Sequence, residues 1–246
     1  MNYNEFLKVL NPEEKKDFEK YSNARGPQSY IIVLGALGDD VAPNTIYKNI
    51  SQIIRYDKGL KDLLFRYLAF MEETIKTYIF RNYDLKSDIE EADEYKYAKR
   101  IYGKVEYRPI SDGNITNLYK KFKLSFGEIK TFLNNENDIK YNDDLLENMR
   151  LLRNDVMHHR MLLFDYDSRF IGNDTFTRVK DFIKLLPSNF AQFLIDDLVD
   201  YTNKKMTEID EKYHKYLLFK SKDYFIDCWL FQEKILQCKC NNFLIV

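Results

Sequence analysis

The segment KGLKDLLFRYLAFMEETIKTYIFRNY, residues 58–83, decides the fold class of this chain. Its apolar side chains recur every three or four residues, which is the spacing of one side of an α-helix; they are Leu60, Leu63, Leu64, Tyr67, Met71, Ile75, Tyr78 and Ile79. Leu68 and Phe70 extend the apolar surface beyond one face. At about 3.6 residues per turn the segment makes about seven turns. It is therefore long enough to run through the centre of a helical bundle.

Helical patterns also precede this segment. Asn11 is a suitable N-cap, and Pro12 suits the first position of the helix that would follow it. Residues 44–56 predict a separate, short amphipathic helix. The apolar run YIIVLGAL, residues 30–37, fits a buried strand as well as a buried helix, because periodicity alone does not decide between them.

Downstream, the pattern is again helical. The spacing predicts a helix over 145–163, with Asp143 or Asp144 as its N-cap and a regular buried stripe formed by Leu145, Met149, Leu152 and Val156. Two further helices are predicted over 176–186 and 187–206, the second beginning at Pro187 or Ser188. An amphipathic run at 223–236 suggests a last helix.

The composition favours one all-α domain over residues 1–246. The chain has only 8 glycines and 5 prolines among 246 residues, whereas the many turns of a β protein usually require more. An N-terminal extension over 1–43 and a C-terminal helical elaboration over 187–246 would flank the central bundle. Residues 85–115 are charged and rich in tyrosine, and we expect them to form a solvent-facing insertion.

The charge pattern and the absence of certain segments limit the location and the partners. The formal net charge is −1, so an RNA ligand has to be held by a local patch or cleft. No apolar run approaches the roughly 18–20 residues that span a bilayer, and the N-terminus lacks the pattern of a signal peptide. We therefore expect a cytoplasmic protein without a membrane partner.

The three cysteines lie near the C-terminus and do not indicate a metal site. Cys228, Cys238 and Cys240 include a C-x-C spacing rather than C-x-x-C, and no fourth zinc ligand is evident. We expect reduced, partly buried thiols, and no metal or other cofactor.

The stretch LLRNDVMHHR, residues 151–160, holds two of the three histidines. On a helix, Asn154 and His158 are four residues apart and share one face, with Arg153 at its edge. These groups suit cleavage of an RNA phosphodiester. An imidazole transfers protons near neutral pH, and a guanidinium binds phosphate through two hydrogen bonds. The amide of Asn154 would orient the imidazole or bond a phosphate oxygen. The alternative is a solvated helix face with no chemistry.

The same residues carry a resemblance. Residues 153–158, Arg-Asn-Asp-Val-Met-His, match R-N-x-x-x-H, a form of the R-x(4–6)-H motif of the HEPN superfamily. With Leu152 before it and His159 after it, the stretch resembles the Abi-like (AbiD/AbiF) abortive-infection proteins. The segment EETIKTYI, residues 72–79, is similar to a second motif of that family and precedes the first in the family order. The resemblance covers about 58–83 and 145–165, and Arg160 departs from the family spacing.

The resemblance implies a fold, an activity and partners. The fold would be a HEPN-like helical bundle, and the activity a metal-independent endoribonuclease that leaves 2′,3′-cyclic phosphate ends. Arg153, Asn154 and His158 would be the catalytic residues. A homodimer would bring two motifs into one composite cleft, which also answers a chemical need, because one histidine supplies only the acid or the base. Such proteins act in phage defence or as toxins restrained by an antitoxin, here a protein or a small RNA.

Other residues have supporting roles in this hypothesis, each beside a plainer interpretation. His159 is more simply a structural histidine, and Asp155 either tunes His158 or is a surface residue. Glu72 would pair with Arg153 across a helix interface, or be an exposed glutamate. Candidate RNA-binding cations are Lys96, Arg100, Arg108 and Arg160. The first three lie among tyrosines in a segment that would stack and neutralise single-stranded RNA, or would be a solvated insertion.

Two functions from different classes therefore remain open at the level of the sequence. One is the HEPN endoribonuclease, in which His158 acts as general acid or base and Arg153 binds the scissile phosphate. The other is a non-catalytic HEPN module that binds RNA or a partner protein. Loss of cleavage on replacement of His158 separates the two.

Overall fold

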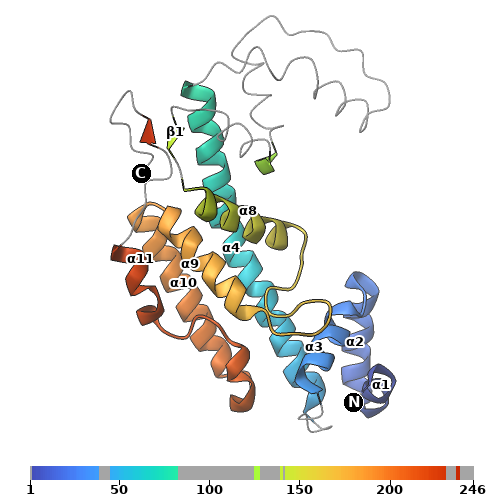
Figure 1. Cartoon of the computed structure of the whole chain (residues 1–246). Coiled ribbons are helices and arrows are strands. Elements are labelled where there is room, and N and C mark those ends of the chain that lie inside the picture. Colours follow the sequence, from blue (N-terminus) through green and yellow to red (C-terminus); the bar gives the residue numbers. More distant parts are fainter. Residues whose placement is uncertain are drawn as a thin grey trace, which may run out of the picture. The chain divides into compact units, whose positions relative to one another are not determined.

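The computed structural model describes residues 2–38, 45–82, 125–127, 139–140, 142–230 and 237–238 (Figure 1). These residues are mostly helical, which confirms the all-α class. The chain divides into two compact units. The first comprises Met1–Leu68 and Asn142–Ile235, with the last residue, and the second comprises Ala69–Tyr141 and Leu236–Ile245. The prediction of a single domain stays a prediction.

The first unit begins with three short helices, α1 (Tyr3–Val9), α2 (Pro12–Arg25) and α3 (Gln28–Leu37). Asn11 caps α2 as predicted. Its side chain accepts hydrogen bonds from the backbone N–H groups of Glu13 and Glu14, and the Glu14 carboxylate accepts one from the Asn11 N–H in return. Such reciprocal bonds satisfy groups that a helix end otherwise leaves unpaired. The ambiguous run at 30–37 is helical and largely buried.

Helix α4 (Ile46–Asn82) is one continuous helix of 37 residues, so the prediction of two helices with a break near residue 57 is wrong. The two predicted elements, 44–56 and 58–83, left residue 57 between them. Asp57 is instead completely buried by tertiary contacts. Gly59 is an interior residue of α4, and its Cα lies against the Tyr201 side chain. Of the predicted apolar stripe, Leu60, Leu64, Met71 and Ile75 are buried, and Leu63 and Tyr67 are half-buried. Leu68, predicted to extend the apolar surface, is buried as well.

The remaining helices of the first unit follow α4 in the chain. They are α8 (Asp143–Met157), α9 (Gly172–Leu185), α10 (Ser188–Met206) and α11 (Ile226–Leu230), with the 3₁₀ helices η2 (Glu211–Tyr216) and η3 (Lys222–Phe225) before α11. Helix α8 packs along α9, and α9 contacts α10 and α11 (Figure 1). The predicted start of α10 at Ser188 is confirmed, and α9 begins four residues earlier than predicted.

Helix α10 is joined to the first part of α4 by polar contacts, one of them buried and one exposed. The Tyr56 hydroxyl lies 3.0 Å from Thr202 Oγ1, and it accepts a hydrogen bond from the Leu218 N–H at 3.0 Å. The Tyr201 hydroxyl donates to the Arg55 carbonyl at 3.0 Å. A Cβ atom at Gly59 would collide with the Tyr201 ring. The Tyr201 ring therefore lies against α4 in this position because residue 59 has no Cβ atom.

The second unit is described in part. It contains the rest of α4 from residue 69 and a short antiparallel pair, β1 (Ile139–Lys140) and β2 (Gln237–Cys238), in which Ile139 is opposite Cys238. None of the helices within the described ranges combines the length and apolar character that a membrane crossing requires.

Candidate functional site

The polar cluster lies at the C-terminal end of α8. The buried stripe predicted for this helix is confirmed, because Leu145, Met149, Leu152 and Val156 are each at most 6 % exposed. Asn142 caps the helix, so the prediction of Asp143 or Asp144 as the N-cap is wrong by one or two residues; the Asn142 side chain accepts from the Leu145 N–H at 3.2 Å. The stripe fixes the rotation of α8 about its own axis. It thereby fixes which faces of the last turn carry Arg153, Asn154 and His158.

The helix ends at Met157, so the prediction that it continues to residue 163 is wrong. His158 is the C-cap, and its N–H donates to the Asn154 carbonyl at 3.0 Å. His159 has φ 55, in the left-handed region. The N–H of His159 donates to the Val156 carbonyl at 3.2 Å, and that of Arg160 donates to the Asp155 carbonyl at 2.9 Å. These two bonds form a Schellman turn, in which His159 occupies the position usually held by glycine.

A buried ion pair on α4 holds the chain that leaves this turn. The Asp57 carboxylate accepts from the backbone N–H groups of Leu162 and Leu163, at 2.6 and 3.2 Å. The Lys61 ammonium lies 2.7 Å from the same carboxylate and donates to the carbonyls of His159 and Arg160 at 3.5 and 3.2 Å. Burial raises the pKa of Asp57, while the Lys61 charge and the two N–H donors oppose that rise. We call Asp57 and Lys61 the clamp.

Asp155 is a structural residue in this geometry. Its carboxylate lies 2.9 Å from the Arg178 guanidinium on α9 and 3.4 Å from the Arg160 guanidinium. The first contact ties the last turn of α8 to α9, and the second closes the Schellman turn. The aspartate side chain is 19 % exposed and paired with arginines, so its interpretation as a plain surface residue is wrong. Its predicted electrostatic effect on His158 stays a prediction.

The three candidate catalytic residues lie within one turn of the helix end. The Arg153 guanidinium donates to the Asn154 side-chain oxygen at 3.4 Å, and both side chains are half-buried. The imidazole of His158 is exposed and makes no hydrogen bond to any part of the chain that the structure describes. The structure thus brings Arg153 and Asn154 into contact and leaves His158 accessible at the end of the same helix.

Glu72 lies on the part of α4 that belongs to the second unit. Its carboxylate is 2.7 Å from the Lys76 ammonium, four residues along the helix, and both side chains are largely buried. The interpretation of Glu72 as an exposed glutamate is therefore wrong. Its predicted pairing with Arg153 joins residues of different units and stays a prediction.

The RNA-binding candidates are only partly described. Lys96, Arg100 and Arg108 lie outside the described residues. Arg160 is exposed, with its guanidinium directed to Asp155. It lines a cavity of about 180 Å³ next to the turn, together with Tyr166, which is 73 % exposed.

The cysteines and acidic residues that the structure describes give no sign of a metal centre. Cys228 is buried with a free thiol, and burial raises its pKa. Cys240 lies outside the described residues. Among the residues that are described, no group of three or more histidine, cysteine, aspartate or glutamate side chains is arranged to hold a metal ion.

Three residues of the site were not found from the sequence. Asp57 and Lys61 have one recognisable signal, because an Asp–Lys pair four residues apart interrupts an apolar helix face where a charge is costly without a partner. Arg178 has no such signal, since its contact with Asp155 spans two helices.

Comparisons with known proteins leave the family open. No protein-family model, curated protein or solved structure significantly matches the chain.

Proposed function

We propose that this protein is a metal-independent endoribonuclease of the HEPN type that acts in phage defence or as a toxin. The observation that carries the proposal is the R-N-x-x-x-H sequence at the end of α8, where the imidazole of His158 is exposed one turn beyond Asn154. The resemblance of this sequence to the Abi-like proteins gives the proposal its reaction class.

The proposed reaction uses three groups. His158 takes the proton of the RNA 2′-hydroxyl or protonates the leaving 5′-oxygen. Arg153 binds the scissile phosphate and stabilises the charge that develops on it. Asn154 orients the Arg153 guanidinium through the contact at 3.4 Å. The 2′-oxygen forms a bond to phosphorus as the bond to the 5′-oxygen breaks, which leaves a 2′,3′-cyclic phosphate and a 5′-hydroxyl.

The same proposal includes a second copy of the chain. One His158 supplies either the acid or the base, so a homodimer that joins two α8 ends completes the pair. The partners are then RNA, a second copy of the chain and an antitoxin, and the compartment is the cytoplasm. Arg160 and Tyr166 beside the turn suit binding of the RNA strand, because one is a cation and the other an exposed aromatic ring. Sedimentation of the purified chain tests the dimer.

The test is cleavage of RNA by the purified chain in EDTA. We expect 2′,3′-cyclic phosphate ends from the wild type and a loss of at least about 100-fold in rate for His158→Ala, as is typical for a general acid or base. Arg153→Ala should lose activity to a similar degree. In cells, expression of the wild type should be toxic, and expression of the double variant Arg153→Ala/His158→Ala should not.

The matched control is His159→Gly. This variant removes the neighbouring imidazole, and glycine is the residue that the left-handed backbone of position 159 prefers. It should keep its nuclease activity. Cleavage by His158→Ala at the wild-type rate would refute the proposal, and RNA binding without cleavage by any variant would favour the non-catalytic module instead.

A further inference from the structure

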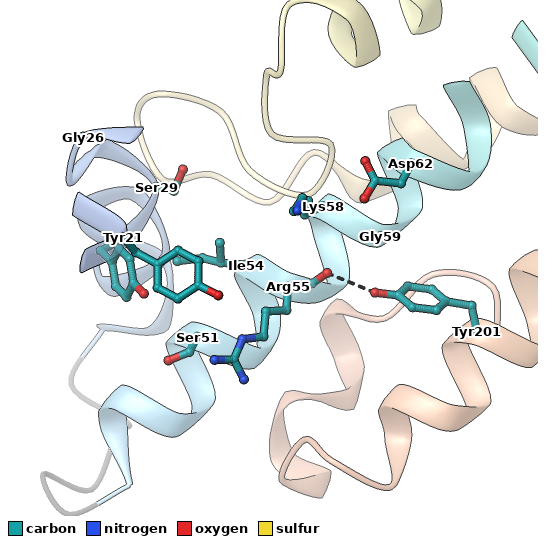
Figure 2. A pocket seen from close by; sticks show the side chains of 11 residues that line it. Tyr21, Gly26, Ser29, Ser51, Ile54, Arg55, Lys58, Gly59, Asp62 and Tyr201 are labelled. Carbon is teal, nitrogen blue, oxygen red and sulfur yellow. Dashed lines mark hydrogen bonds between the residues drawn. The ribbon is translucent and has the colours of Figure 1, made fainter. Parts of the chain in front are cut away.

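A pocket of about 300 Å³ opens among α2, α3, α4 and α10 in the first unit (Figure 2). Its wall on α4 is one stripe of the helix, because Ser51, Arg55, Lys58 and Asp62 follow one another at steps of three or four residues. The volume is at the lower end of the range of about 300–1,000 Å³ for small-molecule sites. None of the residues proposed for RNA cleavage lines it.

The pocket contains two cations whose charges the described part of the protein does not neutralise. Arg55 and Lys58 are exposed, three residues apart on α4. Neither side chain makes a hydrogen bond or ion pair with any residue in the described ranges, Asp62 included. An arginine and a lysine one turn apart match a phosphate monoester, which offers several oxygens and up to two negative charges.

The same pocket contains an accessible aromatic ring. Tyr21, on α2, is 43 % exposed, and Figure 2 shows it across from Tyr201, with Arg55 between them in this view. Tyr201 already has partners within the protein, because its ring stacks on Tyr56 at 5.8 Å and its hydroxyl donates to the Arg55 carbonyl. Tyr30 is buried. Tyr21 is therefore the ring on which a flat ligand can stack.

We propose that this pocket binds a nucleoside monophosphate, with the phosphate on Arg55 and Lys58 and the base on Tyr21. This ligand is assigned because the pocket combines two cations with an accessible aromatic ring. Inorganic phosphate would use only the cations, and an uncharged nucleoside would use only the ring. The Ser29 hydroxyl lies in the same lining and suits a sugar hydroxyl. This site and its ligand are additional to the proposed nuclease function.

The test is calorimetric titration of the full chain with AMP, adenosine and inorganic phosphate in separate arms. We expect AMP to bind more tightly than either of its parts. The double variant Arg55→Gln/Lys58→Gln should weaken AMP binding at least about tenfold, because it removes the charge-assisted contacts. The control Lys16→Gln/Lys204→Gln removes the same net charge at exposed positions outside the pocket. It should change the Kd by less than about twofold, as expected for distant charges screened by salt.

A second variant tests the aromatic half of the site independently. Tyr21→Leu should weaken the binding of AMP and leave the binding of inorganic phosphate unchanged. It also keeps the proposal testable if the double variant does not fold, which a thermal melt followed by circular dichroism would reveal. The proposal is overturned if AMP gives no saturable heat, or if the control pair weakens AMP binding as much as the pocket pair does.

A further arm distinguishes a free nucleotide from the end of an RNA chain. It titrates the His158→Ala chain with AMP and with a 5′-phosphorylated RNA tetranucleotide. AMP binding retained by this variant supports a site separate from the nuclease residues, whatever the outcome of the cleavage test. Tetranucleotide binding that is tighter than AMP binding and is weakened by Arg55→Gln/Lys58→Gln identifies the ligand as an RNA end, and tighter binding of AMP identifies it as a free nucleotide. Loss of AMP binding in His158→Ala would contradict the assigned residues.

Discussion

At the level of single residues, His159 has the most specific backbone requirement in the candidate site. A residue other than glycine with φ 55 is held in a conformation that costs about 1–2 kcal/mol. Replacing His159 by glycine relieves this strain, but glycine costs about 0.5–1 kcal/mol in chain entropy on folding. We therefore predict that His159→Gly leaves the free energy of unfolding unchanged or raises it by up to about 1 kcal/mol. Chemical denaturation measures the difference.

The same substitution one residue earlier provides the control. His158 has φ −91, so His158→Gly removes no strain and should destabilise the protein. Equal effects at the two positions would show that the left-handed turn at His159 is not the structure in solution. His159→Val should be the least stable of the three variants, because β-branched residues fit this conformation worst.

The clamp leads to a second prediction at this scale. Lys61→Met should lower the free energy of unfolding by about 3 kcal/mol, because it leaves the buried Asp57 carboxylate without its cation. Lys58→Met, on the same helix and exposed, should change it by less than about 0.5 kcal/mol. Urea unfolding of both variants compares them. A small effect of Lys61→Met would mean that the two backbone N–H donors alone satisfy Asp57.

At the level of elements, α4 depends on a contact that works against helix propensity. Alanine is favoured over glycine inside a helix by about 1 kcal/mol, yet a Cβ atom at position 59 would collide with Tyr201. We predict that Gly59→Ala destabilises the protein by about 1–3 kcal/mol, the usual cost of overpacking. In a Tyr201→Ala background the same change should be neutral or stabilising. An equal cost in both backgrounds, measured by a double-mutant cycle, would contradict the contact.

The helices differ in how far the sequence alone predicts them, and the difference has a physical cause. The cap at Asn11, the buried stripe of α8 and the start of α10 were predicted, because each depends on neighbouring residues. The end of α8 depends on Asp57, which is about 100 positions away in the chain and accepts the N–H groups of Leu162 and Leu163. No pattern within residues 145–163 reveals that contact.

In the candidate site too, features that depend on neighbouring residues were predicted, and features that depend on distant residues were not. The spacing of Arg153, Asn154 and His158 is visible in the sequence because a single helix carries all three. The clamp and Arg178 were missed, since their roles come from packing between elements. The predicted break in the helix near Asp57 was wrong for the same reason, because a polar residue is taken for a surface residue until its buried partner is known.

At the level of the whole molecule, buried tyrosines make stability depend on alkaline pH. Burial raises the pKa of Tyr56 to about 12 from its ordinary value of 10.0. The folded state therefore keeps this proton to a higher pH than the unfolded state does. The resulting stability is fully present below about pH 10 and is lost as the pH rises toward about 12.

We predict that the free energy of unfolding falls steeply between pH 10 and pH 12 in the wild type and less steeply in Tyr56→Phe. At pH 8 the variant should be less stable by about 1–3 kcal/mol, because the Leu218 N–H loses its acceptor. Urea unfolding at a series of pH values measures both quantities. The gap between the two proteins should narrow as the pH rises, and a constant gap would contradict the raised pKa of Tyr56.

The left-handed turn after α8 has a consequence for recognising distant relatives. The second histidine of the pair is placed by its backbone, and asparagine or glycine adopts the same conformation more readily. Homologues that keep this turn should therefore vary at position 159 among His, Asn and Gly while they keep the residue at position 158. A search pattern that demands two adjacent histidines would overlook them, whereas R-N-x-x-x-H followed by any of these three residues would retrieve them.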